Sequence, residues 1–200
     1  GDENKNGLKV TVAVSADVPS DLSKTDNLLA DADEVSIDDN ASLIVSEAQA
    51  LVLADRFQSN KDGLDIVDNS NGILRVEDYT GSDLSKIPPN TASALKITYA
   101  INASQDFTSL SANQLKANSI SADFIDVAQN VNVTLKSAQA FASKERLIGN
   151  GSLFVPDYNG EDLSVVGGYD NLTVKANILN SVDLANSSNN PLQDVDLIEI

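Results

Sequence analysis

The chain contains no cysteine, histidine, methionine or tryptophan, and aromatic residues make up only 4% of its 200 residues. Without histidine and cysteine it cannot form a Ser-His-Asp triad, a Cys-His nucleophile or a zinc site with His or Cys ligands. The absence of cysteine also excludes disulfides, so cysteine usage says nothing about the redox compartment. We therefore expect a protein without enzymatic activity.

Positive charge is scarce as well. The 13 Lys and Arg residues face 30 Asp and Glu residues, which gives a net charge of −17 at pH 7. Nucleic acids and anionic membranes attract proteins through Lys and Arg, so we expect neither as a partner. No apolar run approaches the roughly 18 residues of a membrane span, so we expect no membrane insertion. At 42% hydrophobic residues, the composition is that of a folded protein.

An internal duplication is the most informative feature of the sequence. Residues 8–14 (LKVTVAV) match residues 95–101 (LKITYAI) at an offset of 87. Further matches follow in the same order: Ile37-Asp38 with Ile125-Asp126 at offset 88, residues 48–50 with 138–140 (both AQA) at offset 90, and residues 72–85 with 151–164 at offset 79. The last block has nine identities in fourteen positions, and the drop in offset indicates an eleven-residue length difference before it. Four collinear matches indicate a tandem duplication.

The duplication predicts the organisation of the chain. We assign residues 8–94 to repeat 1, residues 95–171 to repeat 2 and residues 172–200 to the truncated start of a third repeat. Residues 1–7 are polar, and we expect a linker or a cloning remnant there. The chain is then part of a longer array, whose neighbouring repeats are its first partners.

Apolar residues alternate over many short segments, as in strands. We predict strands at residues 8–14, 35–37, 42–45, 64–67, 73–76, 96–101, 120–126, 131–135, 152–155 and 171–174, and helices at 47–57, 111–117 and 136–145. Ser46 and Gln49 have the spacing of a capping box. Each long helix has one apolar face, made of Ala48, Leu51 and Val52 in the first and Ala138, Phe141 and Ala142 in the second.

These patterns predict a mainly β fold, a tandem-repeat parallel β-solenoid with occasional short helices. The alternative is a pair of tandem β-sandwich domains divided near residue 94. A solenoid has one continuous core through that position, whereas two sandwiches have a hinge there.

Calcium is the cofactor that the composition favours, because carboxylate oxygens are its preferred ligands. The candidate ligands are Asp78 and Asp83 in one repeated loop, Asp157 and Asp162 in its copy, and the cluster Asp62, Asp65 and Asp68. The competing interpretation is that these acids are turn residues that keep the surface soluble. Neither an EF-hand loop nor a glycine-rich calcium-binding nonapeptide occurs.

The same loops carry Tyr79 and Tyr158, each followed by a glycine two residues later. Exposed tyrosines could stack on sugars, but aromatic residues are too few to build a glycan platform. We favour a structural role, in which each ring covers the edge of the core and Gly81 and Gly160 supply a positive φ.

Two segments resemble known repeats. Residues 43–51 (LIVSEAQAL) and 133–141 (VTLKSAQAF) are similar to repeats of very large bacterial surface proteins, namely giant adhesins, secreted RTX-like proteins and S-layer-type proteins. The chain departs from the RTX pattern because it lacks the Gly-Gly-x-Gly-x-Asp nonapeptide. The resemblance implies an extracellular or cell-surface location in a bacterium and a cell-surface or matrix component as a further partner.

We therefore expect a non-enzymatic structural or adhesive repeat segment of a large secreted or cell-surface protein. The alternative is a calcium-dependent or glycan-binding module. A hydrolase is a third hypothesis, for which the carboxylates of Asp38 and Asp126 would be a candidate pair.

Overall fold

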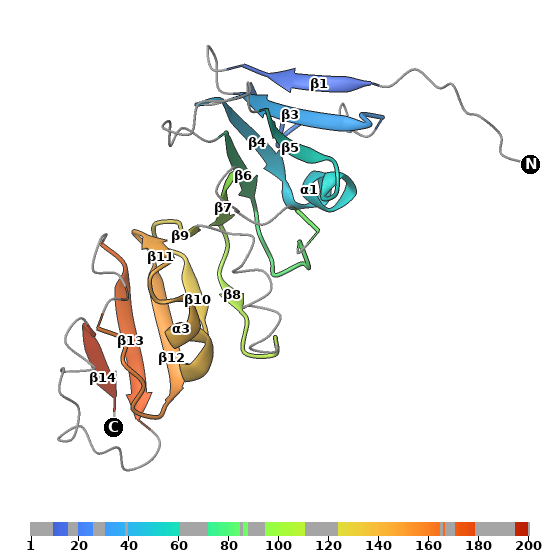
Figure 1. Cartoon of the computed structure of the whole chain (residues 1–200). Coiled ribbons are helices and arrows are strands. Elements are labelled where there is room, and N and C mark those ends of the chain that lie inside the picture. The colour runs from blue at the N-terminus through green and yellow to red at the C-terminus, as the bar shows by residue number, and fades with distance from the viewer. Residues whose placement is uncertain are drawn as a thin grey trace, which may run out of the picture.

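The computed structural model describes residues 10–15, 20–25, 31–38, 40–60, 72–84, 86–87, 95–110, 124–164, 166, 171–178 and 195–199. Every strand pairing among these residues is parallel. The strands stack from β1 at one end to β14 at the other, with two short helices on the outside (Figure 1). The parallel β-solenoid is thus confirmed. The tandem β-sandwich is wrong, because its sheets consist of antiparallel pairs.

The strands in chain order are β1 (Thr11–Val14), β2 (Ser20–Asp21), β3 (Glu34–Asp38), β4 (Ser42–Ser46), β5 (Phe57–Asn60), β6 (Ile73–Glu77), β7 (Lys96–Ile101), β8 (Gln105–Asp106), β9 (Phe124–Val127), β10 (Asn132–Thr134), β11 (Leu147–Gly149), β12 (Ser152–Tyr158), β13 (Thr173–Ile178) and β14 (Leu197–Glu199). The helices are α1 (Glu47–Leu53), after β4, and α3 (Ser137–Ser143), after β10.

The strands form three sheets that overlap like steps. Sheet A has the order β1-β3-β5, sheet B the order β2-β4-β6-β7-β9-β11, and sheet C the order β8-β10-β12-β13-β14. Up to β6 the chain alternates between sheets A and B. From β7 to β12 it alternates between sheets B and C. Sheet B is therefore shared, since it contains the second strand of each early coil and the first strand of each later coil.

The duplication is visible in these elements. Helices α1 and α3 begin and end 90 residues apart, and β6 and β12 begin 79 residues apart. Strand β13 begins and ends 77 residues after β7 and pairs with β12 as β7 pairs with β6. The strands β7 to β12 thus repeat β1 to β6. The residue boundaries that we assigned to the repeats stay a prediction.

One part of the sequence alignment is wrong. Tyr99 of β7 pairs with Ile125, and its counterpart Val12 pairs with Val35 rather than with Ile37. The offset at β3 and β9 is therefore 90 and not 88. A shift of two residues keeps every side chain on the same face of a strand, so hydrophobic alternation cannot detect it.

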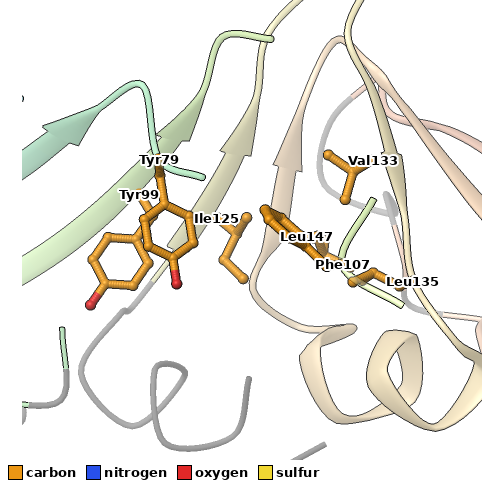
Figure 2. A pocket seen from close by; sticks show the side chains of 7 residues that line it. All are labelled: Tyr79, Tyr99, Phe107, Ile125, Val133, Leu135 and Leu147. Atoms are coloured by element: carbon orange, nitrogen blue, oxygen red, sulfur yellow. The ribbon is translucent and has the colours of Figure 1, made fainter. Parts of the chain in front are cut away.

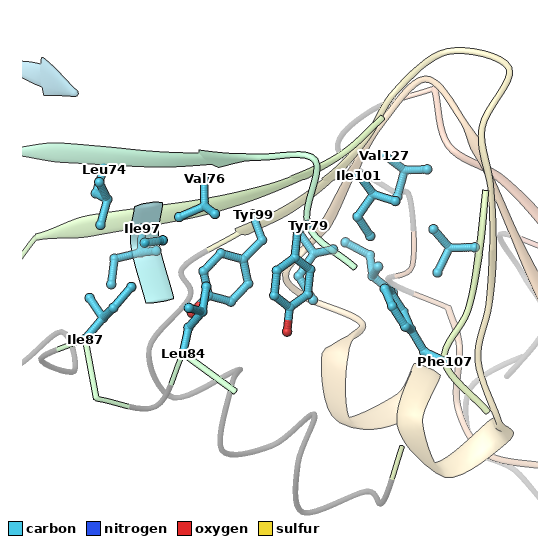
Figure 3. Packing of buried hydrophobic residues seen from close by; sticks show 14 of the residues in the cluster. Leu74, Val76, Tyr79, Leu84, Ile87, Ile97, Tyr99, Ile101, Phe107 and Val127 are labelled. Carbon is cyan, nitrogen blue, oxygen red and sulfur yellow. The ribbon is translucent and has the colours of Figure 1, made fainter. Parts of the chain in front are cut away.

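The core runs without interruption across residue 94. Leu74 and Val76 of β6 lie beside Ile97 and Tyr99 of β7, and all four side chains are fully buried (Figure 3). The ring of Tyr79 stacks on that of Tyr99 with centroids 4.4 Å apart. All these residues belong to a hydrophobic cluster that includes side chains from sheets A, B and C. The continuity expected of a solenoid is therefore present at the junction of the repeats.

The helices differ from their predicted extent and orientation. Both are seven residues long and end before the predicted boundaries, because a turn over residues 54–56 or 144–146 leads from each helix into β5 or β11. The predicted apolar face points outward: Leu51, Val52 and Phe141 are 45%, 52% and 44% exposed. The residues buried against the sheets are instead Gln49, Ala50 and Leu53 in α1, and Ser137, Gln139, Ala140 and Ser143 in α3.

Most predicted strands are present with shifted ends. The prediction of 96–101 coincides with β7, and eight others overlap a strand. Five strands were missed: the two-residue strands β2 and β8, then β5, β11 and β14. The predicted strand 64–67 and the predicted helix 111–117 lie outside the described residues.

Two equivalent glycines precede β6 and β12, where the chain passes close to the preceding coil. A Cβ on Gly72 would lie 2.7 Å from the carbonyl oxygen of Ile37. On Gly151 it would lie 2.6 Å and 2.7 Å from the carbonyl oxygens of Ala128 and Val131. These neighbours are backbone atoms, so they cannot move aside as the tip of a side chain would.

We expect Gly151→Ala to lower the free energy of unfolding by about 1–3 kcal/mol, since the added methyl group overpacks the coil-to-coil contact. Urea denaturation followed by circular dichroism measures the change. Ser109→Ala, at an exposed turn position, is the control and should stay within about 0.5 kcal/mol of the parent. A Gly151→Ala variant as stable as this control would show that the coils are not in such close contact.

Candidate functional site

The repeated loops with the candidate calcium ligands begin where β6 and β12 end: Asp78 follows β6, whereas Asp157 and Tyr158 are the last two residues of β12. We call residues 78–87 and 157–166 the joint segments, because they lead the chain from the last strand of one repeat to the first strand of the next. Their apolar side chains are buried in equivalent positions: Tyr79, Leu84 and Ile87 in the first, and Tyr158, Leu163 and Val166 in the second. Each joint segment thus closes the core at the end of a repeat.

The prediction that the two tyrosines are structural is confirmed. Tyr79 and Tyr158 are 2% and 1% exposed, and Gly81 and Gly160 both have φ of +100°. The hydroxyl of Tyr79 donates to the carbonyl oxygen of Ser82, 3.2 Å away. These rings are therefore part of the core and are not accessible to a sugar.

The acids of the first joint segment lie near β7 and its buried tyrosine. The carboxylate of Asp78 accepts a hydrogen bond from the side-chain amide of Asn102, 3.1 Å away, and Asp78 has a left-handed backbone with φ of +57°. Burial raises the pKa of the Tyr99 phenol, and the charges of Tyr79, Asp83 and Glu47 add to that rise. Asp83 therefore lies close to the buried ring pair.

The acids of the second joint segment hold backbone and cationic groups. Asp157 accepts a hydrogen bond of 2.8 Å from the backbone N–H of Ser137, in the first turn of α3. Asp162 accepts one of 3.0 Å from the backbone N–H of Ser164 and pairs with Lys144 at 3.6 Å. Hydrogen bonds from the side chain and the backbone of Ser164 hold the pKa of Asp162 below its usual value.

The turn at Asp162 occurs at two further places. Asp21 accepts from the backbone and hydroxyl of Ser23, and Asp106 does the same with Thr108. These bonds are the largest cause of the lowered pKa of both carboxyls. An Asp followed two residues later by Ser or Thr is therefore a recurring turn of this fold.

The acidic residue between helix and joint segment is at different positions in the two repeats. In repeat 1, Glu47 of α1 accepts hydrogen bonds from the backbone N–H groups of Thr80 and Ser82 at 3.1 Å and 3.0 Å. In repeat 2, the residue equivalent to Glu47 is Ser137, and the residue equivalent to Ser82 is Glu161. The Ser137 hydroxyl donates to the side-chain oxygen of Asn159 at 2.9 Å, and the Glu161 carboxyl lies close enough to Ser137 for this side chain to lower its pKa. Both repeats therefore have a carboxylate between the helix and the joint segment, and repeat 2 has Asp157 there as well.

The Glu161 carboxyl is partly buried. Its Oε2 atom is shielded from solvent and has no hydrogen-bond partner among the described residues. Burial raises the pKa of Glu161, and the nearby charge of Asp157 acts in the same direction, whereas the Ser137 side chain lowers it. The ionised form of Glu161 is therefore less stable in the fold than in water.

Among the described residues, no group of three or more Asp or Glu side chains is arranged to hold a metal ion. The candidates Asp62, Asp65 and Asp68 lie outside the described residues, in the segment by which repeat 1 exceeds repeat 2. Calcium binding stays a prediction. The carboxylate pair proposed for a hydrolase is not made of equivalent positions, because Asp126 of β9 corresponds to Ser36. Asp126 forms an ion pair with Arg75 of β6 at 2.8 Å.

Each helix has a buried glutamine. The sequence predicted the capping role of Gln49 but not the bonds that its side chain makes to another coil. The side-chain oxygen of Gln49 accepts from the backbone N–H of Ser46 at 2.8 Å, as the capping box predicts. Its side-chain nitrogen also donates to the carbonyl oxygens of Leu22 and Thr25, at 2.9 Å and 2.8 Å. Leu22 and Thr25 belong to the turn after β2, in the preceding coil. The glutamine therefore joins two coils.

Gln139 repeats this arrangement in α3, where it is 1% exposed. It accepts from the backbone N–H of Lys136 at 2.6 Å and donates to the carbonyl oxygens of Phe107 and Leu110, at 2.9 Å and 2.6 Å. We call Gln49 and Gln139, with these partners, the glutamine clamps. The identical AQA triplets were the available signal for them, since a shared glutamine between two alanines is unusual for a solvent-exposed helix face.

An apolar pocket lies below sheet B beside the junction of the repeats. Its lining consists of Tyr79, Tyr99, Phe107, Ile125, Val133, Leu135 and Leu147 (Figure 2). Tyr79 comes from the first joint segment, and the other side chains come from repeat 2. The pocket is therefore a gap in the packing of repeat 2, closed on one side by Tyr79 of the first joint segment.

None of the described helices is long and apolar enough to cross a membrane. No protein-family model, no curated protein and no solved structure matches the chain. The inference of function therefore depends on the geometry of the repeats themselves.

We expect Gln139→Glu to lower the free energy of unfolding by about 2–4 kcal/mol, because two buried carbonyl groups lose their donor. Gln49→Glu should have a similar effect. Gln105→Glu, at a half-buried position of β8, is the control and should change stability by less than about 0.5 kcal/mol. Chemical denaturation measures all three. Equal stability of the Gln139 and Gln105 variants would rule out the glutamine clamp.

We expect Asp162→Ala to lower Tm by about 2–4 °C, the shift that about 1 kcal/mol produces in a chain of this size. Because the carboxylate holds a turn and a lysine, the loss should be the same in EDTA and in millimolar calcium. Asp106→Ala removes the equivalent turn outside the joint segments and should respond to calcium in the same way. If Asp162→Ala lost stability only in calcium, the joint segments would be calcium sites.

We expect Glu161→Gln to raise the free energy of unfolding at pH 7. Since the pKa of Glu161 is raised in the folded state, folding favours its protonated form, and its contribution to stability falls as the pH rises above about 4.5. The advantage of the Gln variant should therefore disappear near pH 4. Glu145→Gln, at an exposed position, is the control for urea titrations at both pH values. A Gln variant less stable than the parent at pH 7 would contradict the buried-charge interpretation.

Proposed function

We propose that the chain is a non-enzymatic structural or adhesive repeat segment of a large secreted or cell-surface protein. The observation that carries the proposal is the pairing of β6 with β7, which joins the last strand of one repeat to the first strand of the next within sheet B. A repeat that continues the sheet of its neighbour is suited to a long array without flexible linkers.

A second support comes from β12 and β13, which pair in the same register as β6 and β7. Leu153 lies beside Val174 in one pair, as Leu74 lies beside Ile97 in the other. The same joint is therefore made twice, so each added repeat extends the array by an equivalent step. Neighbouring repeats of the same chain are accordingly its first proposed partners.

The adhesive part of the proposal is supported by the outward faces of the helices. Leu51 of α1 and Phe141 of α3 occupy equivalent positions and are 45% and 44% exposed. An array of such repeats presents a large apolar side chain at this helix position in each repeat, on a strongly acidic surface, since the net charge is −17. This pattern suits repeated weak contacts with a cell-surface or matrix component, because many weak sites in one array act together.

A single experiment decides whether the chain has the proposed secreted or cell-surface location. Antibodies raised against the folded chain should label intact cells of the source bacterium, or its culture medium, without permeabilisation. An antibody against a ribosomal protein is the control and should label only permeabilised cells. If both antibodies required permeabilisation, the chain would belong to an intracellular protein and the proposed function would be wrong.

A further inference from the structure

Strand β1 occupies the same structural position as β7 and β13. Each of the three begins a repeat and pairs on one side with the neighbouring strand of its own repeat in the same sheet, namely β3, β9 and β14. On the other side, β7 pairs with β6 and β13 pairs with β12. Within the part of the chain that the structure describes, β1 has no strand on that side.

The burial of equivalent side chains reflects this difference. Ile97 of β7 and Val174 of β13 are fully buried, whereas the equivalent Val10 is 40% exposed. Ala100 is fully buried, and the equivalent Ala13 is exposed. At the position of Ile97, Val174 and Val10 the chain thus contains its own comparison, because this position is buried twice and exposed once.

The edge of β1 also lacks the features that usually protect a free edge. Residues 10–14 (VTVAV) contain neither a charged residue nor a proline. Among the other edge strands, β2 and β8 have two residues and end in Asp21 and Asp106, and β14 ends in Glu199. The remaining two, β5 (FQSN) and β11 (LIG), also lack charge and proline, but β5 is mostly polar and β11 has only three residues. Natural sheets protect their edges with short strands and charges, so an apolar, uncharged edge indicates a surface that is meant to be paired.

We propose that the free edge of β1 is a docking surface for the last strand of another repeat of the same kind, placed ahead of β1 in a longer chain. The docking strand has the pattern Gly-x-Leu-x-Val shared by residues 72–76 and 151–155. Its Leu and Val lie beside Val10 and Val12, as Leu74 and Val76 lie beside Ile97 and Tyr99. This inference rests on the proposed function, since it names the surface through which the array continues.

The backbone fixes which amides the docking strand covers. Lys96 donates its N–H to the carbonyl oxygen of Gly72 at 2.9 Å, and Thr173 donates to that of Gly151 at 3.0 Å. Because alternate residues of a parallel strand point to the same neighbour, the N–H groups of Thr11 and Ala13 are the equivalent donors on the free side of β1.

A second copy of the chain does not provide a suitable strand. Both Gly-x-Leu-x-Val strands, β6 and β12, are already paired on the side in question, by β7 and β13. A head-to-tail dimer could offer β14 to β1, but no pair of that kind occurs among the described strands. The occupant is therefore a preceding repeat in the same polypeptide.

The test compares the chain with an extended chain in which a second copy of residues 95–171 precedes residue 8. This fusion places a copy of β12 ahead of β1 with the spacing that separates β12 from β13. The matched control carries Leu153→Asp and Val155→Asp in the added copy alone. Hydrogen exchange of peptides covering residues 10–14 is measured by mass spectrometry, with sedimentation to report the oligomeric state.

We expect the amides of Thr11 and Ala13 to exchange at least about tenfold more slowly in the extended chain than in the chain alone or in the control. All three proteins should sediment as monomers. If the peptides common to both copies of repeat 2 were protected as one population, the added copy would be folded. Unchanged exchange at β1 would then overturn the proposal. A dimer of the chain alone, or amides of β1 already as slow as those of β7, would also overturn it.

A second measurement does not depend on the folding of the added copy. In the chain alone, Val10→Asp should leave Tm within about 2 °C of the parent, whereas Ile97→Asp should lower it by more than about 10 °C. An equal loss in both variants would show that the edge of β1 is already covered. These results are independent of the antibody experiment, because a surface protein need not dock at β1 and an intracellular array could do so.

Discussion

A single parallel coil cannot bury its own apolar face, so every coil of this protein depends on the strand pairing that attaches it to the next one. At the junction of the repeats this pairing is made by β6 and β7, and it turns the second sheet of one repeat into the first sheet of the following one. Both the continuous core and the stepped arrangement of sheets A, B and C follow from this shared sheet.

Polar groups hold the coils in register around this apolar stack. The glutamine clamps tie each helix to the turn of the preceding coil, and Arg75 links β6 to Asp126 of β9 on the outer face. The acids of the joint segments bind backbone N–H groups, as Asp157 does at the start of α3. The high acid content is thus partly structural, since Glu47 in repeat 1 and Asp157 in repeat 2 each join the helix to the joint segment through backbone N–H groups.

The sequence contained enough to predict the solenoid and the duplication, because inward residues such as Leu74 and Val76 repeat with strand periodicity in every coil. It could not supply the register of β3 against β9, since a two-residue shift preserves the alternation. Hydrophobic periodicity also could not predict which face of each helix is buried, because Gln49 is buried only through partners that lie 24 and 27 residues away. For the same reason, the sequence could not show that Asp157 and Asp162 accept hydrogen bonds from the backbone N–H groups of Ser137 and Ser164.

The pairing of β6 with β7 is tested most directly by a short crosslink across it. The chain has no cysteine, so a variant with Ile73→Cys and Lys96→Cys contains one thiol pair, at two positions that lie side by side in the register. Adjacent strands are about 5 Å apart, so the shortest bis-methanethiosulfonate reagent should join this pair within one chain. The reagent should join this pair much faster than it joins the diagonal pair of Ile73→Cys and Thr98→Cys. If neither pair reacted, or if the diagonal pair reacted faster, the two repeats would not share a sheet in this register.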